Sequence, residues 1–186
     1  MRTFLALELP GEFKEELAKA IRELQVLVPH GVKWVMKDNL HITMLFIGDV
    51  GPGKISELKS EFQAILKDLK SFAIDQPQIE VISIRNPRLV WVKCNFISPE
   101  LPIVVDRIRQ YLEKEGFEID KKPFRLHITL GRIKKTIENR VVENLFRVDL
   151  RDKRWTVSEA TFYESRLLPE GPEYSKIATF NLQEVK

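Results

Sequence analysis

Two of the three histidines in this 186-residue chain stand in the same short motif. Residues 41–44 read His-Ile-Thr-Met, residues 127–130 read His-Ile-Thr-Leu, and a leucine precedes each histidine. An imidazole exchanges protons near neutral pH, and a threonine hydroxyl can donate a hydrogen bond to an oxyanion. Two such pairs on one surface would supply an acid, a base and two hydroxyl donors, which is chemistry suited to a phosphoryl group.

The spacing within each motif fits a β-strand. Successive side chains of a strand point to opposite faces, so His41 and Thr43 share one face, as do His127 and Thr129. The intervening apolar residues would face a core. The two copies lie about half a chain length apart, which indicates a duplication in which each half contributes one histidine and one threonine. If the halves meet about a pseudo-two-fold axis, the pairs face each other.

The surrounding pattern predicts an α+β protein. Apolar alternation predicts strands at residues 3–9, 32–36, 40–47, 72–84, 89–96, 124–130, 155–163 and 174–182. Apolar residues at three- and four-residue spacing predict helices at 12–28, 55–69, 100–115 and 137–146, with Gly116 after the third and Thr136 as N-cap of the fourth. Strand pairs between helices favour antiparallel pairing. No low-complexity linker is evident, so we expect one domain over residues 1–186.

The composition narrows the class of protein. The single cysteine, Cys94, excludes an intrachain disulfide framework and a multi-cysteine metal site. There is no apolar run of transmembrane length, and Glu8 interrupts the short apolar start, so we expect a cytoplasmic protein without a signal peptide. The net charge of +3 permits an anionic partner without requiring one.

The paired motifs resemble those of the 2H phosphoesterases, in the branch of RNA 2′,3′-cyclic phosphodiesterases, also called 2′-5′ RNA ligase-like proteins. The resemblance spans nearly the whole chain. It includes the start Arg-Thr-Phe-Leu-Ala-Leu, Trp34-Val35, Pro123-Phe124, the segment Tyr163-Glu164-Ser165-Arg166-Leu167, and Gly171-Pro172.

This resemblance implies a bilobal α+β fold: two similar antiparallel-sheet lobes with helices outside and a pseudo-two-fold cleft between them. It implies hydrolysis of RNA 2′,3′-cyclic phosphate ends, tRNA fragments among them, to 2′-phosphates. His41 would be the proton donor and His127 the proton acceptor, while Thr43 and Thr129 would hold the phosphate oxygens. We expect no cofactor and no metal, and a monomer. The near-identical motifs do not themselves distinguish acid from base.

A dense basic stretch surrounds the second motif, from Lys121 to Lys135. It fits either attraction of RNA phosphates or a solvated strand edge that discourages aggregation. Within it, Arg132 is the best candidate to contact the substrate phosphate. Four aromatic residues could stack on a base but more often pack in a core: Trp34, Phe46, Tyr163 and Tyr174.

Other interpretations remain open from sequence. The histidines could join a carboxylate in a zinc site, although neither has a second ligand nearby in the chain. The segment Gly48–Ile55 approaches a phosphate-binding loop, but Ile55 replaces the metal-binding hydroxyl and Pro52 removes a backbone N–H. The chain could also be an RNA-binding protein, or an RNA end-sealing ligase that uses the same residues.

Overall fold

The computed structural model describes residues 1–82 and 86–185. In chain order the elements are β1 (Arg2–Glu8), α1 (Gly11–Leu27), β2 (Val32–Trp34), η1 (Lys37–Asn39), β3 (His41–Asp49), η2 (Pro52–Lys54), α2 (Ile55–Leu66), β4 (Phe72–Ile82), β5 (Leu89–Phe96), α3 (Glu100–Lys114), β6 (His127–Ile133), α4 (Asn139–Leu145), β7 (Trp155–Val157), β8 (Glu159–Leu168) and β9 (Gly171–Asn181).

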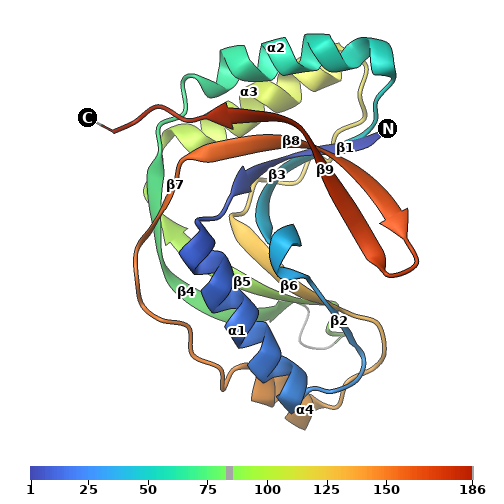
Figure 1. Cartoon of the computed structure of the whole chain (residues 1–186), viewed down its shortest axis with the longest axis vertical. Coiled ribbons are helices and arrows are strands. Elements are labelled where there is room, and N and C mark those ends of the chain that lie inside the picture. The colour runs from blue at the N-terminus through green and yellow to red at the C-terminus, as the bar shows by residue number, and fades with distance from the viewer. Residues whose placement is uncertain (83–85, 186) are drawn as a thin grey trace.

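The strands form one curled nine-stranded sheet with two similar halves (Figure 1). Its order is β7-β4-β5-β6-β3-β1-β8-β9, with β2 also pairing with β6. Neighbouring named strands run antiparallel. The halves join at β3 and β6, where Ile42 pairs with Ile128. The join therefore lies between the two histidine motifs, as expected for an axis that relates two copies.

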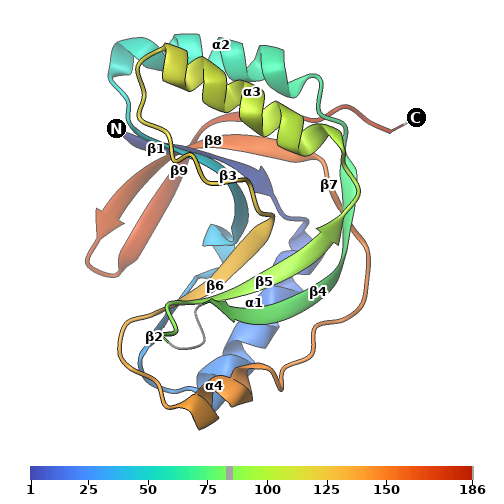
Figure 2. The same ribbon diagram turned by 180° about the vertical axis from the view of Figure 1, so that it is seen from behind.

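The element order explains how the copies interlock. With the short strands β2 and β7 and the final strand β9 set aside, each copy has the order strand, helix, strand, helix, strand: β1-α1-β3-α2-β4 and then β5-α3-β6-α4-β8. The last strand of each copy joins the other half of the sheet, since β4 pairs with β5 and β8 pairs with β1. Figures 1 and 2 show α2 and α3 together on one half and α1 and α4 together on the other. The predicted α+β, two-lobed architecture is confirmed, with strands exchanged between the copies.

Apolar helix faces pack against the sheet and fix each half. The predicted stripe of α1 is buried, and Phe13 stacks on Trp155 with ring centroids 3.9 Å apart. On the other half, Phe62 of α2 meets Phe162 of β8 edge-on at 5.2 Å. These contacts leave the face opposite the helices free for polar side chains.

The alternation expected of β3 and β6 is present. Ile42 and Ile128 are fully buried and Leu130 is too, whereas both histidines are only half-buried on the opposite face. Burying one branched aliphatic side chain contributes roughly 1.5–3 kcal/mol, so slipping either strand by one residue would expose its apolar set at large cost. The apolar residues of the motif therefore hold the histidines in register.

Several predicted boundaries were wrong. The strand expected at 124–130 begins at His127 and runs to Ile133, because β5 and β2 flank it only over that span. The strand expected at 155–163 is two strands: β7 pairs with β4, and β8 pairs with β1 and β9. One apolar run thus crosses from one half to the other. The end of the strand expected at 72–84 lies outside the described residues.

The predicted N-cap of the fourth helix was also wrong. α4 begins at Asn139, and Glu138 precedes it without a side-chain capping bond. The backbone N–H groups of Lys134 and Lys135 both donate to the carbonyl of Gly31. This holds the segment against the turn after α1, so the helix starts later than Thr136 would allow.

Gly131 of β6 pairs with Trp34 of the neighbouring strand β2, and it gives a stability prediction. A Cβ there would sit 2.7 Å from Val32 Cγ1 and 2.8 Å from Trp34 Cε3. Gly131→Ala should therefore overpack this strand pair and lower the free energy of unfolding by about 1–3 kcal/mol, measured by urea denaturation. Gly53→Ala is the control, since nothing lies within 4 Å of its added Cβ. Equal free energies of unfolding for the two variants would contradict the prediction and show that β2 shifts to make room for the added Cβ.

Candidate active site

The sequence-predicted site residues meet in one cleft of about 280 Å³. Its walls come from β3, β6, the β2–η1 segment and the start of β9. The lining residues are Lys33, Trp34, Val35, Met36, Asn39, His41, Thr43, Phe46, Leu89, His127, Thr129, Arg132, Glu170, Gly171, Pro172 and Tyr174. Both histidines, both threonines and Arg132 are thus brought together from the two halves.

His41 is held by hydrogen bonds from both ring nitrogens. Its Nδ1 lies 2.7 Å from the carbonyl oxygen of Asn39, and its Nε2 lies 3.0 Å from Thr43 Oγ1. A carbonyl only accepts, so Nδ1 must carry a proton. In the neutral ring, Nε2 then accepts from the Thr43 hydroxyl, and in the charged ring it becomes a donor.

His127 repeats this arrangement in the other half. Its Nδ1 lies 2.8 Å from the carbonyl oxygen of Arg125, which also stands two residues before the histidine. Nδ1 is again the proton-bearing nitrogen, so the neutral ring keeps a free lone pair on Nε2. The ring packs beside Trp91 with centroids 4.4 Å apart. Both motifs therefore present the same nitrogen for chemistry.

Burial lowers the pKa of both histidines from the ordinary 6.5, since a charged imidazole loses hydration there. The backbone acceptors partly oppose this shift in each case. The remaining charges differ between the two sites. The Glu8 carboxylate favours the charged form of His41, and the individually weaker effects of Lys14 and His127 oppose it. The Arg132 guanidinium favours the neutral form of His127.

Glu8 belongs to a buried polar cluster beside His41 that sequence reasoning missed. It pairs with His41 across β1 and β3, accepts a hydrogen bond from Tyr163, and lies 3.4 Å from Lys14 Nζ. Burial alone would raise the pKa of Glu8, but the Tyr163 bond, Lys14 and Lys176 together lower it. Glu8 is therefore ionised at neutral pH and places a fixed negative charge near His41.

The aromatic candidates divide into two groups. Trp34, Phe46 and Tyr174 line the cleft, whereas Tyr163 is buried and stacks on Phe4. Tyr174 meets the His41 ring edge-on at 5.5 Å. Aromatic side chains in the wall of the cleft are suited to contact with a flat base or ribose face.

Asn39 was another residue that sequence reasoning left without a role at the site. Its side-chain amide donates to the carbonyl of Pro172 at 2.9 Å, while its own carbonyl holds His41. It thereby ties the β8–β9 hairpin to the segment that orients the histidine. No local pattern signals this contact, because the two residues lie 133 positions apart.

The remaining sequence candidates are occupied elsewhere. Lys54 of the near phosphate-binding loop pairs with Glu115 at 2.8 Å and Glu57 at 3.1 Å, so it is not presented to a phosphate. Cys94 is buried, which raises its pKa to about 12. Over residues 1–82 and 86–185 there is no group of three or more metal-ligating side chains. In the same ranges, no helix has the length and apolar character needed to cross a membrane.

A comparison with known protein families assigns the chain to a class of phosphoesterases. The sequence model of the family "LigT like Phosphoesterase" matches residues 7–91 and 96–174. The chain therefore belongs to this family, within the 2H phosphoesterases, and the resemblance seen in the sequence is confirmed.

The chain aligns with two curated relatives over nearly the full length of each protein. The chain is 29% identical to the RNA 2′,3′-cyclic phosphodiesterase of Archaeoglobus fulgidus, over 97% of this chain and 99% of that one. It is 30% identical to the enzyme of the same name from Methanocaldococcus jannaschii, over 95% and 98%.

Solved structures share the fold. A protein from Thermus thermophilus superposes with a TM-score of 0.80 at 25% identity, over 99% of both chains. E. coli LigT complexed with 3′-AMP gives 0.73 at 23% identity over 97% of both, which supports the fold alone.

Proposed function

We propose that this protein hydrolyses RNA 2′,3′-cyclic phosphate ends to 2′-phosphates by two-histidine acid–base catalysis that needs no metal. The observation that carries the proposal is the single cleft in which both imidazoles, each anchored through Nδ1, stand with both threonines. The names of the full-length relatives support the same substrate class.

In the proposed reaction, His127 Nε2 takes a proton from a water molecule, and the water oxygen bonds to phosphorus. The bond from phosphorus to the ribose 3′ oxygen breaks, and the departing oxygen takes a proton from His41 Nε2. The product is a 2′-phosphate and a free 3′ hydroxyl, with one proton moved from His41 to His127. A proton exchange with solvent restores the starting state.

The charges around the two rings support this assignment of roles. A general acid must start protonated, and Glu8 favours the protonated form of His41. A general base must start neutral, and Arg132 favours the neutral form of His127. The motifs are nearly identical in sequence, so the difference arises from residues contributed by other strands and from the end of β6.

Thr43, Thr129 and Arg132 complete the proposed phosphate site. The threonine hydroxyls stand two residues beyond each histidine on the same strand face and donate to the non-bridging phosphate oxygens. Arg132 lies on β6 opposite Lys33 of β2, and both line the cleft. We assign Arg132 to the substrate phosphate, where its guanidinium offsets the negative charge.

One chain supplies the entire site, since residues from both sequence halves meet in it. We therefore propose that residues 1–186 act as one catalytic domain and as a monomer. The proposed substrates are RNA 3′ ends, including tRNA fragments, in the cytoplasm.

Isotope-labelled water distinguishes hydrolysis from end sealing, because the two reactions differ in the nucleophile. An RNA hexamer with a 2′,3′-cyclic phosphate, incubated in ¹⁸O water, should yield a 2′-phosphomonoester that carries one ¹⁸O. Adding an RNA with a 5′ hydroxyl offers the competing nucleophile. An unlabelled 2′-5′ diester as the main product would favour the ligase. If neither the phosphomonoester nor the diester forms, the proposal is rejected.

The lowered histidine pKa values predict an acidic pH optimum. The free enzyme needs one protonated and one neutral imidazole, so kcat/KM peaks midway between their two pKa values, which burial places below 6.5. Activity should fall above the optimum as the acid loses its proton and below it as the base gains one. Bound phosphate raises both pKa values, so the kcat optimum should lie higher than that of kcat/KM. Rate profiles at constant ionic strength test this, and a kcat/KM optimum clearly on the alkaline side of neutrality would contradict it.

A further inference from the structure

A second groove, of about 610 Å³, opens beside the catalytic cleft. Leu89 and Arg132 line both hollows, so the two are adjacent. Its walls are the segment entering β5 and the segment that follows Arg132 toward α4. The proposed chemistry does not use this groove.

Among the described residues that line the groove there are four cations and no acid: Arg88, Arg132, Lys134 and Lys135. All four side chains are exposed. Among the residues that the structure describes, none of the four side chains makes an ion pair or a hydrogen bond. Four like charges in one hollow repel one another, which an anionic ligand would relieve.

The backbone beneath these cations is fixed. The backbone N–H of Ile133 donates a hydrogen bond to the backbone carbonyl of Arg88 at 2.9 Å, which links the two walls of the groove. The N–H of Lys134 donates to Gly31 at 2.7 Å. The backbone that carries the cations is therefore fixed by hydrogen bonds, while their side chains remain free to reach a ligand.

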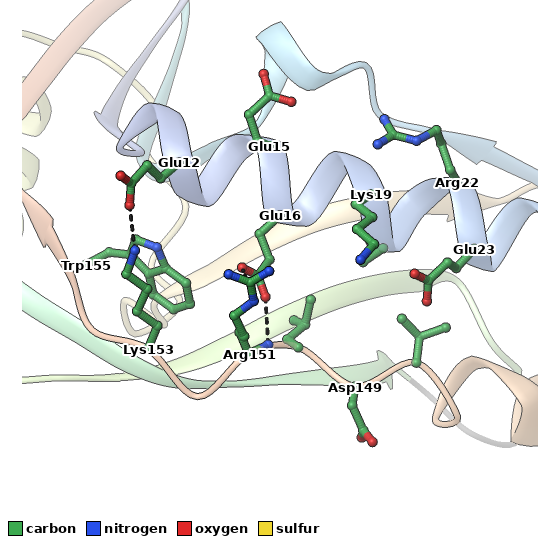
Figure 3. A pocket seen from close by; sticks show the side chains of 13 residues that line it. Glu12, Glu15, Glu16, Lys19, Arg22, Glu23, Asp149, Arg151, Lys153 and Trp155 are labelled. Atoms are coloured by element: carbon green, nitrogen blue, oxygen red, sulfur yellow. Dashed lines mark hydrogen bonds and ion pairs between the residues drawn. The ribbon is translucent and has the colours of Figure 1, made fainter.

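A groove of equal volume elsewhere on the molecule shows that size alone does not define such a site. It lies between α1 and residues 148–155 (Figure 3). There, Lys153 pairs with Glu12 at 2.6 Å, and Arg151 pairs with Glu16 at 3.7 Å. Carboxylates line this groove among its cations, and two of the cations are paired with them, whereas the described lining of the groove beside the catalytic cleft holds no acid.

The hollow on the opposite flank of the cleft differs in character too. It shares Thr43, Phe46 and His127 with the cleft, and its walls are largely apolar and aromatic. Two of its cations are already engaged: Arg109 with Asp106, and Lys122 with Asp120 at 3.4 Å. A polyanion is therefore better matched by the groove at Arg88, Lys134 and Lys135.

We propose that this basic groove binds the backbone phosphates upstream of the cyclic phosphate, so that the preferred substrate is a single-stranded RNA 3′ end several nucleotides long rather than a cyclic mononucleotide. The proposal rests on the proposed function for the identity of the group in the cleft. Contacts to phosphates alone carry no sequence preference, so the groove selects for a chain and not for a base order.

The test compares a hexamer ending in a 2′,3′-cyclic phosphate with a 2′,3′-cyclic mononucleotide. The double variant Lys134→Gln/Lys135→Gln should raise KM for the hexamer on the order of tenfold at low salt, because two exposed phosphate contacts are lost. KM and kcat for the mononucleotide should not change. The slope of log KM against log salt for the hexamer should fall by about 1.4, from roughly 0.7 per single-strand phosphate contact.

The matched control is Lys19→Gln/Arg22→Gln, which removes the same charge from the groove in Figure 3. It should leave KM for the hexamer unchanged, and an equal rise in both double variants would reduce the effect to net charge and overturn the proposal. Equal KM for hexamer and mononucleotide in the wild type would also overturn it.

Binding of a fluorescent hexamer with a 3′-phosphate provides a readout that needs no turnover. If neither cyclic substrate is hydrolysed, the proposed function fails. Weaker hexamer binding by the Lys134/Lys135 variant, but not by the control variant, would still support RNA binding in the basic groove. Identical binding by all three proteins would reject it.

Discussion

Replacing either cleft histidine should nearly abolish hydrolysis of a cyclic phosphate. His41→Ala and His127→Ala should each lower kcat by about 10²–10⁴-fold, the usual contribution of a positioned general acid or base. The double variant should be little worse than either single one, since the two groups serve one transition state. Steady-state rates on an RNA hexamer with a cyclic end give the measurement.

His30→Ala is the matched control, because this third histidine is exposed in the turn after α1 and lies outside the cleft. It should retain wild-type rates. An activated diester with a nitrophenolate leaving group separates the two roles, since such a group departs without a proton. On that substrate His41→Ala should recover most of its activity and His127→Ala should not. The reverse pattern would exchange the acid and base assignments.

Removing a threonine hydroxyl should produce the second-largest loss. Thr43→Val and Thr129→Val keep the β-branched shape that suits a strand but delete the donor. Each should lower kcat by about 10²–10³-fold with little change in KM, because an oxyanion donor acts mostly on charge that develops in the transition state. Initial rates over a range of substrate concentrations separate kcat from KM.

Serine restores the hydroxyl, so Thr43→Ser and Thr129→Ser serve as paired controls and should recover most of the activity. Thr43 also bonds His41 Nε2, so Thr43→Val should in addition move the pH profile, whereas Thr129→Val should leave its shape unchanged. A rise in KM at constant kcat for both valine variants would instead assign the threonines to ground-state binding.

The repeated motif made the core of the site predictable. The spacing of His41 and Thr43 on a strand, repeated at His127 and Thr129, was enough to expect two facing pairs, and all four line one cleft. Arg132 was instead predicted from the basic stretch around the second motif, and it reaches the cleft because the register of β6 shifts between Thr129 and Gly131. Local alternation and duplication are properties that a linear pattern records directly.

Contacts between distant segments were not predictable. Tyr163 and Glu8 lie 155 positions apart, and nothing near either residue signals their bond beside His41. The exchange of strands between the halves was not predictable for the same reason, because it depends on pairing between segments that are far apart in the chain. The apolar pattern of β8 fits any sheet edge, and only pairing with β1 decides to which half it belongs. Arg88 likewise joins the basic groove from another strand, so the sequence shows only the part of that surface near Arg132.

In the proposed mechanism, His41 and His127 act as one acid–base pair on a cyclic phosphate without a metal. The most direct test incubates an RNA hexamer ending in a 2′,3′-cyclic phosphate with wild type, His41→Ala and His127→Ala in excess chelator, and maps the end product. We expect a 2′-phosphate from the wild type and almost none from either variant. Equal conversion by the variants, or a wild type silenced by the chelator, would contradict it.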